Sequence, residues 1–539
     1  MESREHMMKS FCRYGLVAAV AIATWGFKPI QKKLIAHGWD LLAVTPEEVL
    51  AHADAFDQTA IDGVTLMIRE KLADGRAISH TRVMTDPPWP RELLQGKIET
   101  FREIVKHPSL RESFISSWWA PQKRLDWRDD AAWANFATNM ATVAWLAKEG
   151  GLRGILVDAE DYPKTDQYHL KPEDSSYDET ARLARRRGAE VFRAIFKEFP
   201  DVTFLSFWML SLNPSYFGAV DPLGAARAHG ALWPWFVNGM LDVMPDTASF
   251  VDGNEHAYRY EAEQGDFYRS ASLQHTAALD LIAPENRSKY RAHLRAGFGL
   301  YLDSYINPTN SSWYFGPVDG SRTTHLGLNL QQAVKAADEY VWVYGEKRSW
   351  IPWKGTQNKR FVGVETWDGA LPGFTATLLG AKDPLAYLNR RTEQLRAAGA
   401  LSNLVKTVKW PWGVWQDPKK HKGKLGRSEN GEVWAEGVGG GCHLVHLDVL
   451  PGEVYGVHAR IRGIGGSAIV YWQKDGRWQW HVQGVPLASG EAENGEIPVQ
   501  ALVRVPPKVN RLVLELNAHQ QAGERVTFSK VEIHKLISQ

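Results

Sequence analysis

Cysteine is almost absent from this chain of 539 residues, which contains only Cys12 and Cys442. Two cysteines cannot build a disulfide framework or a cysteine-rich metal site, and Cys12 lies in a segment that we expect to be removed. The fold must therefore rest on its hydrophobic core. Hydrophobic residues make up 44% of the chain, which is enough for a large one.

An excess of positive charge is also missing. The chain has 63 Lys and Arg residues against 62 Asp and Glu residues, a formal net charge of +1. Nucleic-acid binding requires a clear basic patch or stripe, so we expect no nucleic-acid partner. No glycine-rich phosphate loop follows the first predicted strand, which argues against a doubly wound nucleotide-binding sheet. We expect neither a cofactor nor a metal ion.

Long apolar runs are lacking, apart from residues 15–25 near the N-terminus. Lys9 and Arg13 precede this run, as in the positive region of a secretory signal. The run is too short to span a bilayer comfortably. We therefore expect residues 1–27 to be a signal peptide and the mature protein to be exported, periplasmic or secreted, without a stable membrane span. An uncleaved anchor or a stray apolar helix is the alternative.

Eight short, apolar, β-rich segments recur along the chain, with helical segments between them. Several are continuously apolar, which is typical of parallel strands covered by helices. A strand followed by a helix eight times over predicts an α/β fold of the TIM type, a (β/α)8 barrel, over residues 28–400. The predicted strands are residues 34–42, 63–68, 114–119, 154–160, 202–209, 248–255, 297–305 and 340–346.

The composition changes near residue 400. Residues 401–430 are basic and rich in Pro, Gly and Trp, and we expect a linker or packing strap there. Residues 431–539 alternate β-rich segments with turns, and Lys474-Asp475-Gly476 has the form of a hairpin turn. This pattern predicts an all-β sandwich, jelly-roll-like and of carbohydrate-binding type. The predicted strands are residues 442–449, 453–461, 467–473, 478–485, 499–505, 511–518 and 525–536.

Carboxylates follow the predicted barrel strands, and the active sites of such barrels lie at that end of the sheet. Asp158 and Glu160 are two residues apart at the end of the fourth strand, so both can point to one side. Two adjacent like charges raise the pKa of one of them, which provides a proton donor. A helix cap or an ion pair with a barrel arginine is the alternative. The candidate catalytic residues are Asp158, Glu160, Glu255 and Glu346.

Aromatic residues gather at the same strand ends, beside Asp40 and Asp303. Sugar rings present apolar C–H faces that stack on aromatic rings, whereas core packing is the alternative role for any single Trp. Taken together, the set favours a carbohydrate partner. The predicted substrate-binding residues are Trp39, Asp40, Trp118, Trp119, Trp208, Tyr258, Asp303 and Tyr305.

The strand ends GILVDAEDY, DGNE and YGEK resemble those of the broad group of TIM-barrel glycoside hydrolases, over roughly residues 32–400. The resemblance implies hydrolysis of a poly- or oligosaccharide between two carboxyl groups. It also implies that Glu160, which closes the fourth strand, is the general acid. In such enzymes the nucleophile often closes the seventh strand, where this chain offers Asp303 and no glutamate.

Three alternatives remain open at this point. A polysaccharide lyase would use Tyr, His or Lys as a base, with His256, Tyr258 and Lys347 among the candidates. A metal-dependent hydrolase would need several His, and His37 and His256 are isolated. A non-catalytic carbohydrate-binding protein would need only the aromatic rim. In the C-terminal part, an aromatic group could bind sugar or pack against the barrel through residues 410–415. That group comprises Tyr471, Trp472, Trp478 and Trp480.

Overall fold

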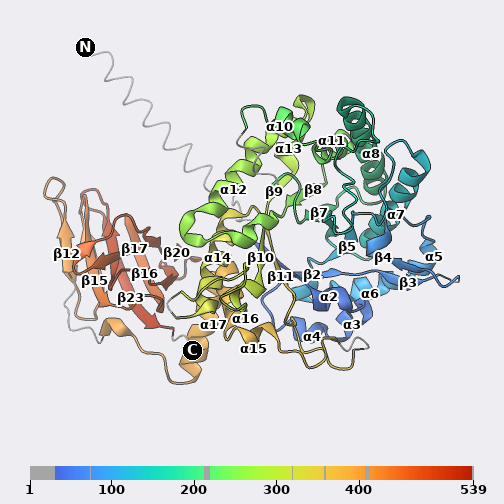
Figure 1. The fold of residues 1–539 in the computed structure, drawn as a ribbon. Coiled ribbons are helices and arrows are strands. Elements are labelled where there is room, and N and C mark those ends of the chain that lie inside the picture. The colour runs from blue at the N-terminus through green and yellow to red at the C-terminus, as the bar shows by residue number, and fades with distance from the viewer. Residues whose placement is uncertain are drawn as a thin grey trace, which may run out of the picture.

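The computed structural model describes residues 31–72, 74–211, 219–318, 320–356, 360–406 and 413–536. The predicted signal peptide, residues 1–27, lies outside them. An α/β part of the chain carries an all-β part at one side (Figure 1). No helix among the described residues is both long enough and apolar enough to cross a membrane.

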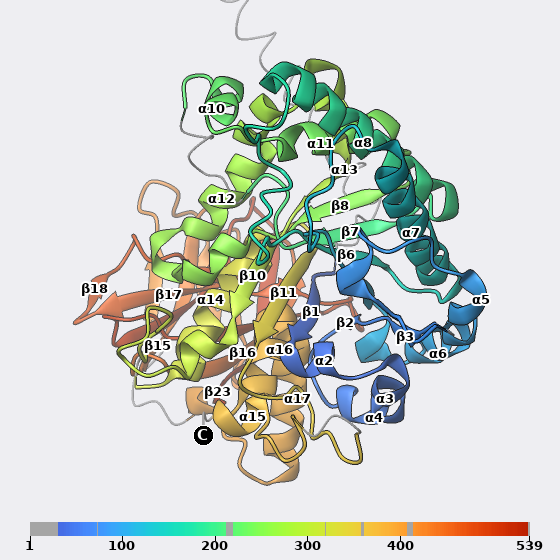
Figure 2. The same ribbon diagram turned by 45° about the vertical axis from the view of Figure 1, so that its right-hand side comes forward.

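A nine-stranded parallel sheet forms the centre of the α/β part (Figure 2). Its strand order is β10-β11-β1-β2-β5-β6-β7-β8-β9, and every neighbouring pair is parallel. The two end strands, β9 and β10, are separated in sequence by Gly297 alone, so the sheet is nearly closed on itself. Each of the eight predicted barrel segments contains one of the nine strands, and β9 lies outside all eight segments. The nine strands are β1 (Lys33–Gly38), β2 (Gly63–Leu66), β5 (Phe114–Trp118), β6 (Gly154–Asp158), β7 (Thr203–Ser206), β8 (Ser249–Asp252), β9 (Leu294–Ala296), β10 (Phe298–Tyr301) and β11 (Tyr340–Gly345).

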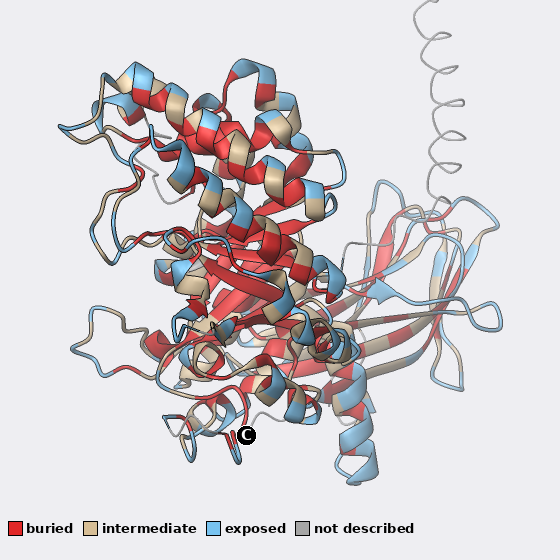
Figure 3. Cartoon of the chain, turned by 90° about the vertical axis from the view of Figure 1, so that its right-hand side faces the viewer, coloured by how far each residue is buried: buried red, intermediate tan, exposed pale blue. Residues whose placement is uncertain are grey.

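Helices cover the outside of this sheet. The strand residues are almost all buried, while the helices bury one face and expose the other (Figure 3). A small hairpin, β3 (Arg69–Lys71) and β4 (Ala77–Ser79), follows β2. The helices are α2 (Trp39–Ala43), α3 (Pro46–Ala51), α4 (Ala53–Phe56), α5 (Arg91–Leu94), α6 (Gly96–Ile104), α7 (Asp130–Glu149), α8 (Tyr177–Glu198), α10 (Pro222–Ala228), α11 (Trp233–Val243), α12 (Asp266–His275), α13 (Arg287–His293), α14 (Arg322–Ala336), α15 (Trp367–Ala370), α16 (Phe374–Lys382) and α17 (Pro384–Ala397).

The C-terminal β domain, residues 413–536, consists of two antiparallel sheets that share one hydrophobic core. One sheet has the order β12-β15-β22-β17-β18, with β19 beside β17; the other has the order β13-β14-β23-β16-β21-β20. The strands are β12 (Gly413–Gln416), β13 (Lys424–Arg427), β14 (Val433–Glu436), β15 (Gly441–Asp448), β16 (Val454–Gly463), β17 (Gly466–Lys474), β18 (Arg477–Trp478), β19 (Val485–Pro486), β20 (Ala488–Ser489), β21 (Ile497–Arg504), β22 (Arg511–Ala518) and β23 (Arg525–Lys535).

Two predictions for this domain differ from the structure. Residues 401–430 were expected to be a linker, but they contain β12 and β13, which pair with β15 and β14. Residues 478–485 do not form a continuous strand, because only their ends, in β18 and β19, pair with β17. The predicted hairpin turn is present: Asp475 and Gly476 have φ angles of 51° and 77° between β17 and β18.

The α/β part and the C-terminal β domain meet through α17, which packs against β21. Leu388 and Leu395 of this helix form a small buried cluster with Val454 and Leu536. The contact is close, since a side chain at Gly456 of β16 would begin 2.4 Å from the Cδ1 atom of Leu388. The two parts are therefore joined by a small hydrophobic cluster that is separate from both main cores.

Candidate active site

The four candidate catalytic carboxylates come from three strands of the sheet, at the carboxyl end of each. Asp158 is the last residue of β6 and Glu160 lies two residues beyond it. Glu255 follows β8 by three residues, and Glu346 directly follows β11. In the strand order, β6 and β11 are separated by β1, β2 and β5 on one side and by β7 to β10 on the other. Glu160 and Glu346 therefore stand on opposite sides of the opening.

These four residues, hereafter the carboxylate cluster, interact electrostatically. Burial, followed by the charge of Glu160, raises the pKa of Asp158 well above its usual range. Burial raises the pKa of Glu160 too; the hydrogen bond from Tyr162 opposes this shift and the charge of Glu346 adds to it. Burial and the charge of Glu160 raise the pKa of Glu255 to about 8. Glu255 thus holds a proton at neutral pH that an isolated carboxylic acid would release, and the shifts of Asp158 and Glu160 have the same direction.

Short-range hydrogen bonds fix the position of Glu160. Its backbone N–H donates to Oδ1 of Asp158 (2.9 Å), and its carbonyl accepts from Nε1 of Trp118 (2.9 Å). The hydroxyl of Tyr162 donates to Oε1 of Glu160 (3.0 Å). Main chain and side chain are therefore both held. The ring of Trp118 lies 6.5 Å from that of Tyr162, so the indole also flanks the cluster.

Glu346 is held differently, by two tyrosines of the neighbouring strands. The hydroxyl of Tyr344 donates to Oε1 of Glu346 (3.0 Å), and Tyr301 forms a further side-chain hydrogen bond with the same carboxylate. The backbone N–H of Glu346 donates to Oδ2 of Asp303 (2.7 Å). Asp303 was predicted to bind substrate, but it is fully buried and positions Glu346 instead.

A group of stacked aromatic rings forms the wall beside Glu346 and Glu255. The Tyr258 ring lies 5.4 Å from Tyr301 and 6.1 Å from Tyr344, at interplanar angles of 29° and 11°. His37 stacks on Tyr344 at 5.3 Å, and burial lowers the pKa of this histidine to about 3, so it is neutral. The sequence prediction included Tyr258 and missed Tyr301 and Tyr344. The sequence did contain a signal for both tyrosines. Tyr301 lies two residues before Asp303 and Tyr344 two residues before Glu346, and residues two apart on an extended chain point to the same side.

Three predicted substrate-binding residues are buried. Trp119 is fully buried among Phe136, Phe192 and Phe236, and Tyr305 is 2% exposed. Asp40 is fully buried as well, where it accepts hydrogen bonds from the Trp350 amide (2.8 Å) and from Nε1 of Trp353 (2.9 Å). Burial raises the pKa of Asp40 to about 6. Burial keeps Trp119 and Asp40 away from the surface, while Tyr305 lines a pocket described below, because proximity to a strand end does not decide which way a side chain points.

Of the other predicted aromatics, Tyr258 is buried, whereas Trp39, Trp118 and Trp208 are at least partly accessible. Trp208 is half-buried, with its ring 5.5 Å from that of Trp233. Trp39 is 38% exposed, and the guanidinium of Arg360 lies 4.5 Å above its ring. Trp313, which the sequence interpretation did not single out, is half-buried beside Tyr258 and Tyr301. Partly exposed aromatic residues therefore lie in the loops after β1, β7 and β10, although guanidinium groups cover the rings of Trp39 and Trp313.

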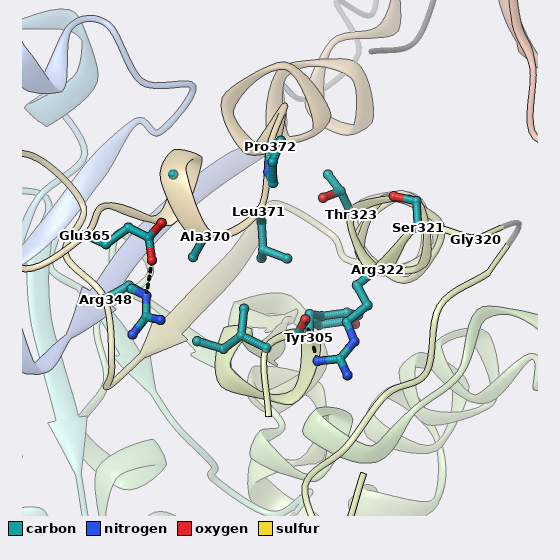
Figure 4. A pocket seen from close by; sticks show the side chains of 12 residues that line it. Tyr305, Gly320, Ser321, Arg322, Thr323, Arg348, Glu365, Ala370, Leu371 and Pro372 are labelled. Atoms are coloured by element: carbon teal, nitrogen blue, oxygen red, sulfur yellow. Dashed lines mark hydrogen bonds and ion pairs between the residues drawn. The ribbon is translucent and has the colours of Figure 1, made fainter. Parts of the chain in front are cut away.

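A pocket of about 520 Å³ is lined by none of the four carboxylates of the cluster; Figure 4 shows the side chains that do line it. Tyr305 and Ile306 line it from the loop after β10, and Arg348 and Glu365 line it from the segment after β11. The start of α14 closes a further side. A smaller hollow of about 270 Å³ is lined by Trp39, Leu42, Ala43, Arg69 and Arg360.

A trio of metal-ligand types, Asp54, Asp57 and His107, lies away from this site. These residues precede β2 and β5, at the amino ends of the strands. Asp57 already accepts hydrogen bonds from His107 (3.0 Å) and from the Ser109 hydroxyl (2.6 Å). These contacts account for the trio as a link between α4 and the segment before β5.

In the C-terminal β domain the aromatic group divides. Trp472 is 2% exposed and belongs to the core. Trp478 and Trp480 stack on each other at 4.9 Å and 13°, with Tyr471 edge-on at 5.7 Å from Trp480. Trp480 is 68% exposed, so it does not pack against the α/β part. The alternative interpretation of the sequence, packing through residues 410–415, rests partly on residues 410–412, which lie outside the described residues.

No protein-family model and no curated protein matches the chain. Parts of it are similar to solved structures. They include the enzymatically active domain of bacteriophage CBA120 tailspike protein 4 (12% identity, TM-score 0.19) and a structure titled "CBM4 structure and function" (11%, 0.19). A third is TmCBM61 in complex with β-1,4-galactotriose (14%, 0.18). The matches cover 23%, 23% and 25% of this chain and 19%, 86% and 94% of the other chains. The chain thus spans about a fifth of the tailspike domain.

Burial of Glu255 predicts a pH-dependent stability effect. The pKa of Glu255 is about 8 in the folded protein, against 4.5 in a model peptide. Between these values the folded state keeps a proton that the unfolded chain releases, so stability falls as pH rises through this window. Glu255→Gln removes the penalty. We expect a free energy of unfolding higher than that of the wild type by roughly 1–3 kcal/mol at pH 8.5, with no gain at pH 4.

Urea unfolding of the α/β part at pH 4, 6 and 8.5 measures this effect. Glu103→Gln is the matched control, because Glu103 is fully exposed on α6 and its hydrogen bond with Lys106 lowers its pKa. The control should gain nothing at pH 8.5. An equal gain in both variants, or a pH-independent gain in Glu255→Gln, would contradict the burial of an uncharged carboxyl group.

Proposed function

We propose that this protein is a glycoside hydrolase that cleaves a poly- or oligosaccharide at the carboxylate cluster. The observation that carries the proposal is the pairing of Glu160 and Glu346. They stand at the ends of strands on opposite sides of the sheet, yet the charge of one raises the pKa of the other. Two carboxyl groups facing each other across a cleft are what hydrolysis of a glycosidic bond requires.

We also propose that β9 and β10 are one strand interrupted at Gly297. The sheet then has eight strands and is a closed (β/α)8 barrel. Gly297 supports this, because a side chain there would begin 2.5 Å from Cγ1 of Val251 on the adjacent strand β8. A strand that passes so close to its neighbour needs glycine at the crossing point. On this view the cluster occupies the usual catalytic face of such a barrel.

Glu160 is the general acid in this proposal. Burial raises its pKa, which favours the protonated form, and the protonated side chain gives its proton to the glycosidic oxygen as the C1–O bond breaks. Glu346 acts from the opposite side. Its carboxylate either attacks the anomeric carbon or takes a proton from the water that does so. The backbone anchor on Asp303 and the two tyrosine hydroxyls fix the carboxylate for this role.

The tyrosines argue against a lyase that uses one of them as a base. Burial and the neighbouring carboxylates raise the pKa values of Tyr162, Tyr301 and Tyr344, so their hydroxyls stay protonated. A protonated hydroxyl donates hydrogen bonds and cannot abstract a proton. Their role as donors to Glu160 and Glu346 fits hydrolysis.

The C-terminal β domain is proposed to hold the same glycan. Trp478 and Trp480 form a stacked pair with one exposed outer face, next to Tyr471. An exposed indole face of this kind matches the apolar face of a sugar ring. Binding there would keep the polymer near the cleft without taking part in the reaction.

An array of plant, algal and bacterial polysaccharides incubated with the pure protein tests the proposal. Both new reducing ends and ultraviolet absorbance of unsaturated products should be recorded. We expect reducing ends without that absorbance on at least one polymer. Reducing ends with absorbance would establish a lyase. Binding without cleavage would establish a non-catalytic carbohydrate-binding protein.

A further inference from the structure

The larger pocket is lined by two arginines. Arg322, the first residue of α14, and Arg348, two residues beyond Glu346, enter it from different sides (Figure 4). We call this the arginine pocket. Its volume of about 520 Å³ is large enough for a sugar residue with its substituents, and the lining is mostly polar. A mostly polar pocket of this size is suited to a hydrophilic ligand.

Arg322 has its position fixed without having its charge neutralised. Its Nη1 donates to the carbonyls of Tyr305 (3.3 Å) and Asn307 (2.7 Å), and its guanidinium lies 4.8 Å over the ring of Tyr314. None of the described carboxylates forms an ion pair with it. Nε and Nη2 are left with no acceptor in the described part of the chain, and a bidentate anion is the natural acceptor for such a fork.

Arg348 is only partly neutralised. Its Nε donates to Oε2 of Glu365 (3.0 Å), and its Nη1 donates to the carbonyl of Lys347 (3.0 Å). Both side chains of this ion pair are substantially exposed, at 32% and 52%. A surface pair of this kind is weak and open to exchange with a better-placed anion.

The arginine pocket adjoins the proposed reaction centre. Asp303, which positions the backbone of Glu346, lies two residues before Tyr305 of the pocket wall. Arg348 of the pocket lies two residues beyond Glu346, and Lys347 between them bonds Oδ1 of Asn307. The same short segments of chain therefore hold both the pocket and Glu346.

A second, independent hollow has the same chemistry. The hollow of about 270 Å³ combines Trp39 with Arg69 and Arg360 and has no acidic residue in its lining. It lies at the loops after β1, β2 and β11, at the same end of the sheet as the cluster. Arg360 lies over the ring of Trp39 and Arg69 donates to the Leu42 carbonyl, so this hollow adds positive charge at this end of the sheet.

We propose that the substrate is an anionic glycan, whose carboxylate or sulfate groups bind Arg322 and Arg348 in the arginine pocket while the chain is cut at the cluster. This inference rests on the proposed hydrolase function. It follows from the charge of the pocket: Arg322 has carbonyl acceptors but no ion pair with a described carboxylate, and Arg348 has only an exposed one. An anionic group on the glycan would supply the missing counter-charge, whereas a neutral glycan would not.

Matched polymers test the inference. Each polysaccharide that the array shows to be cleaved is compared with its neutralised form, methyl-esterified for a uronate and desulfated for a sulfate ester. We expect cleavage of the anionic form, at least tenfold weaker action on its neutral counterpart, and a KM that rises with salt. Loss of activity on the methyl-esterified polymer would identify a carboxylate as the recognised group, and loss on the desulfated polymer would identify a sulfate. Equal action on neutral and charged forms, or cleavage of neutral polymers only, overturns the inference and leaves the hydrolase proposal intact.

Arginine variants locate the effect. Arg322→Gln and Arg348→Gln should each raise KM on the anionic polymer about tenfold to a hundredfold, with a smaller change in kcat. Arg182→Gln is the matched control, since Arg182 is exposed on the outer face of α8. The pocket variants should lose the salt dependence of KM, and the control should keep it. Loss of kcat alone, with KM and its salt dependence unchanged, would contradict a binding role.

A binding assay tests the inference if no polymer is cleaved. Affinity electrophoresis in gels containing polygalacturonate, its methyl ester, a carrageenan or its desulfated form then replaces kinetics. Retardation by a charged polymer that disappears in Arg322→Gln supports the inference although hydrolysis has failed. No retardation by any charged polymer, or equal retardation by charged and neutral forms, overturns it.

Discussion

Glu160→Gln is expected to lower kcat/KM on the polysaccharide about 10²- to 10⁴-fold while the protein stays folded. Glutamine keeps the size of the side chain and can still interact with Tyr162, but it has no proton to give to the leaving oxygen. The backbone bonds from Glu160 to Asp158 and Trp118 involve only main-chain atoms of residue 160 and should persist. Kinetics on the substrate found by the array, with circular dichroism as a check on folding, measure the effect.

An aryl glycoside of the same sugar sharpens this test. A leaving group such as dinitrophenolate departs without being protonated, so the variant should keep most of its activity on it. Glu149→Gln is the matched control, because Glu149 ends α7 and forms a surface ion pair with Arg102. It should behave as the wild type on both substrates. Wild-type action of Glu160→Gln on the polysaccharide would remove Glu160 from the role of general acid.

The strands could be predicted from the sequence because their burial on both faces requires continuously apolar segments. A strand covered on both faces must be apolar throughout, and Gly154–Asp158 and Tyr340–Gly345 are nearly so. The carboxylates that follow them stand out for the same reason, since a polar group after a buried run lies where the chain reaches the surface. The positions of Glu160, Glu255 and Glu346 at one end of the sheet follow from parallel strands alone.

Side-chain direction could not be predicted at the same positions. Trp118 and Trp119 are neighbours at the end of β5, yet one flanks Glu160 and the other is fully buried among phenylalanines. Successive residues of an extended chain point to opposite faces, so an error of one residue exchanges rim and core. The burial of Asp40 could not be predicted for a related reason. The partners of Asp40, Trp350 and Trp353, lie more than 300 residues away and only the fold brings them near.

The hydrogen-bonding partners of the cluster show a further limit of local pattern. Tyr301 and Tyr344 lie inside strands whose apolar character makes tyrosine an ordinary core residue. They become functional candidates only when the sheet places β10 beside β11 in register, with Tyr301 opposite Tyr344. The pairing of Glu160 with Glu346 has the same origin, since nothing in the sequence near either residue indicates the other.

Glu346→Gln is expected to remove activity on the polysaccharide and on the activated aryl glycoside alike, by a factor on the order of 10⁴. Leaving-group chemistry does not help this variant, because the missing carboxylate acts at the anomeric carbon and not at the departing oxygen. The contrast with Glu160→Gln, which keeps activity on the aryl glycoside, assigns the two roles.

Glu255→Gln provides the discriminating comparison for the second carboxylate. Glu255 also interacts with Glu160, but it lies two strands from β6 rather than across the sheet, so its amide variant should stay within about tenfold of wild type on the aryl glycoside. If Glu255→Gln is the variant that loses both activities while Glu346→Gln keeps them, the partner of Glu160 is Glu255. The second catalytic carboxylate would then be identified by its electrostatic interaction with Glu160 and not by its position across the sheet. The tyrosines around Glu346 would bind sugar hydroxyls instead.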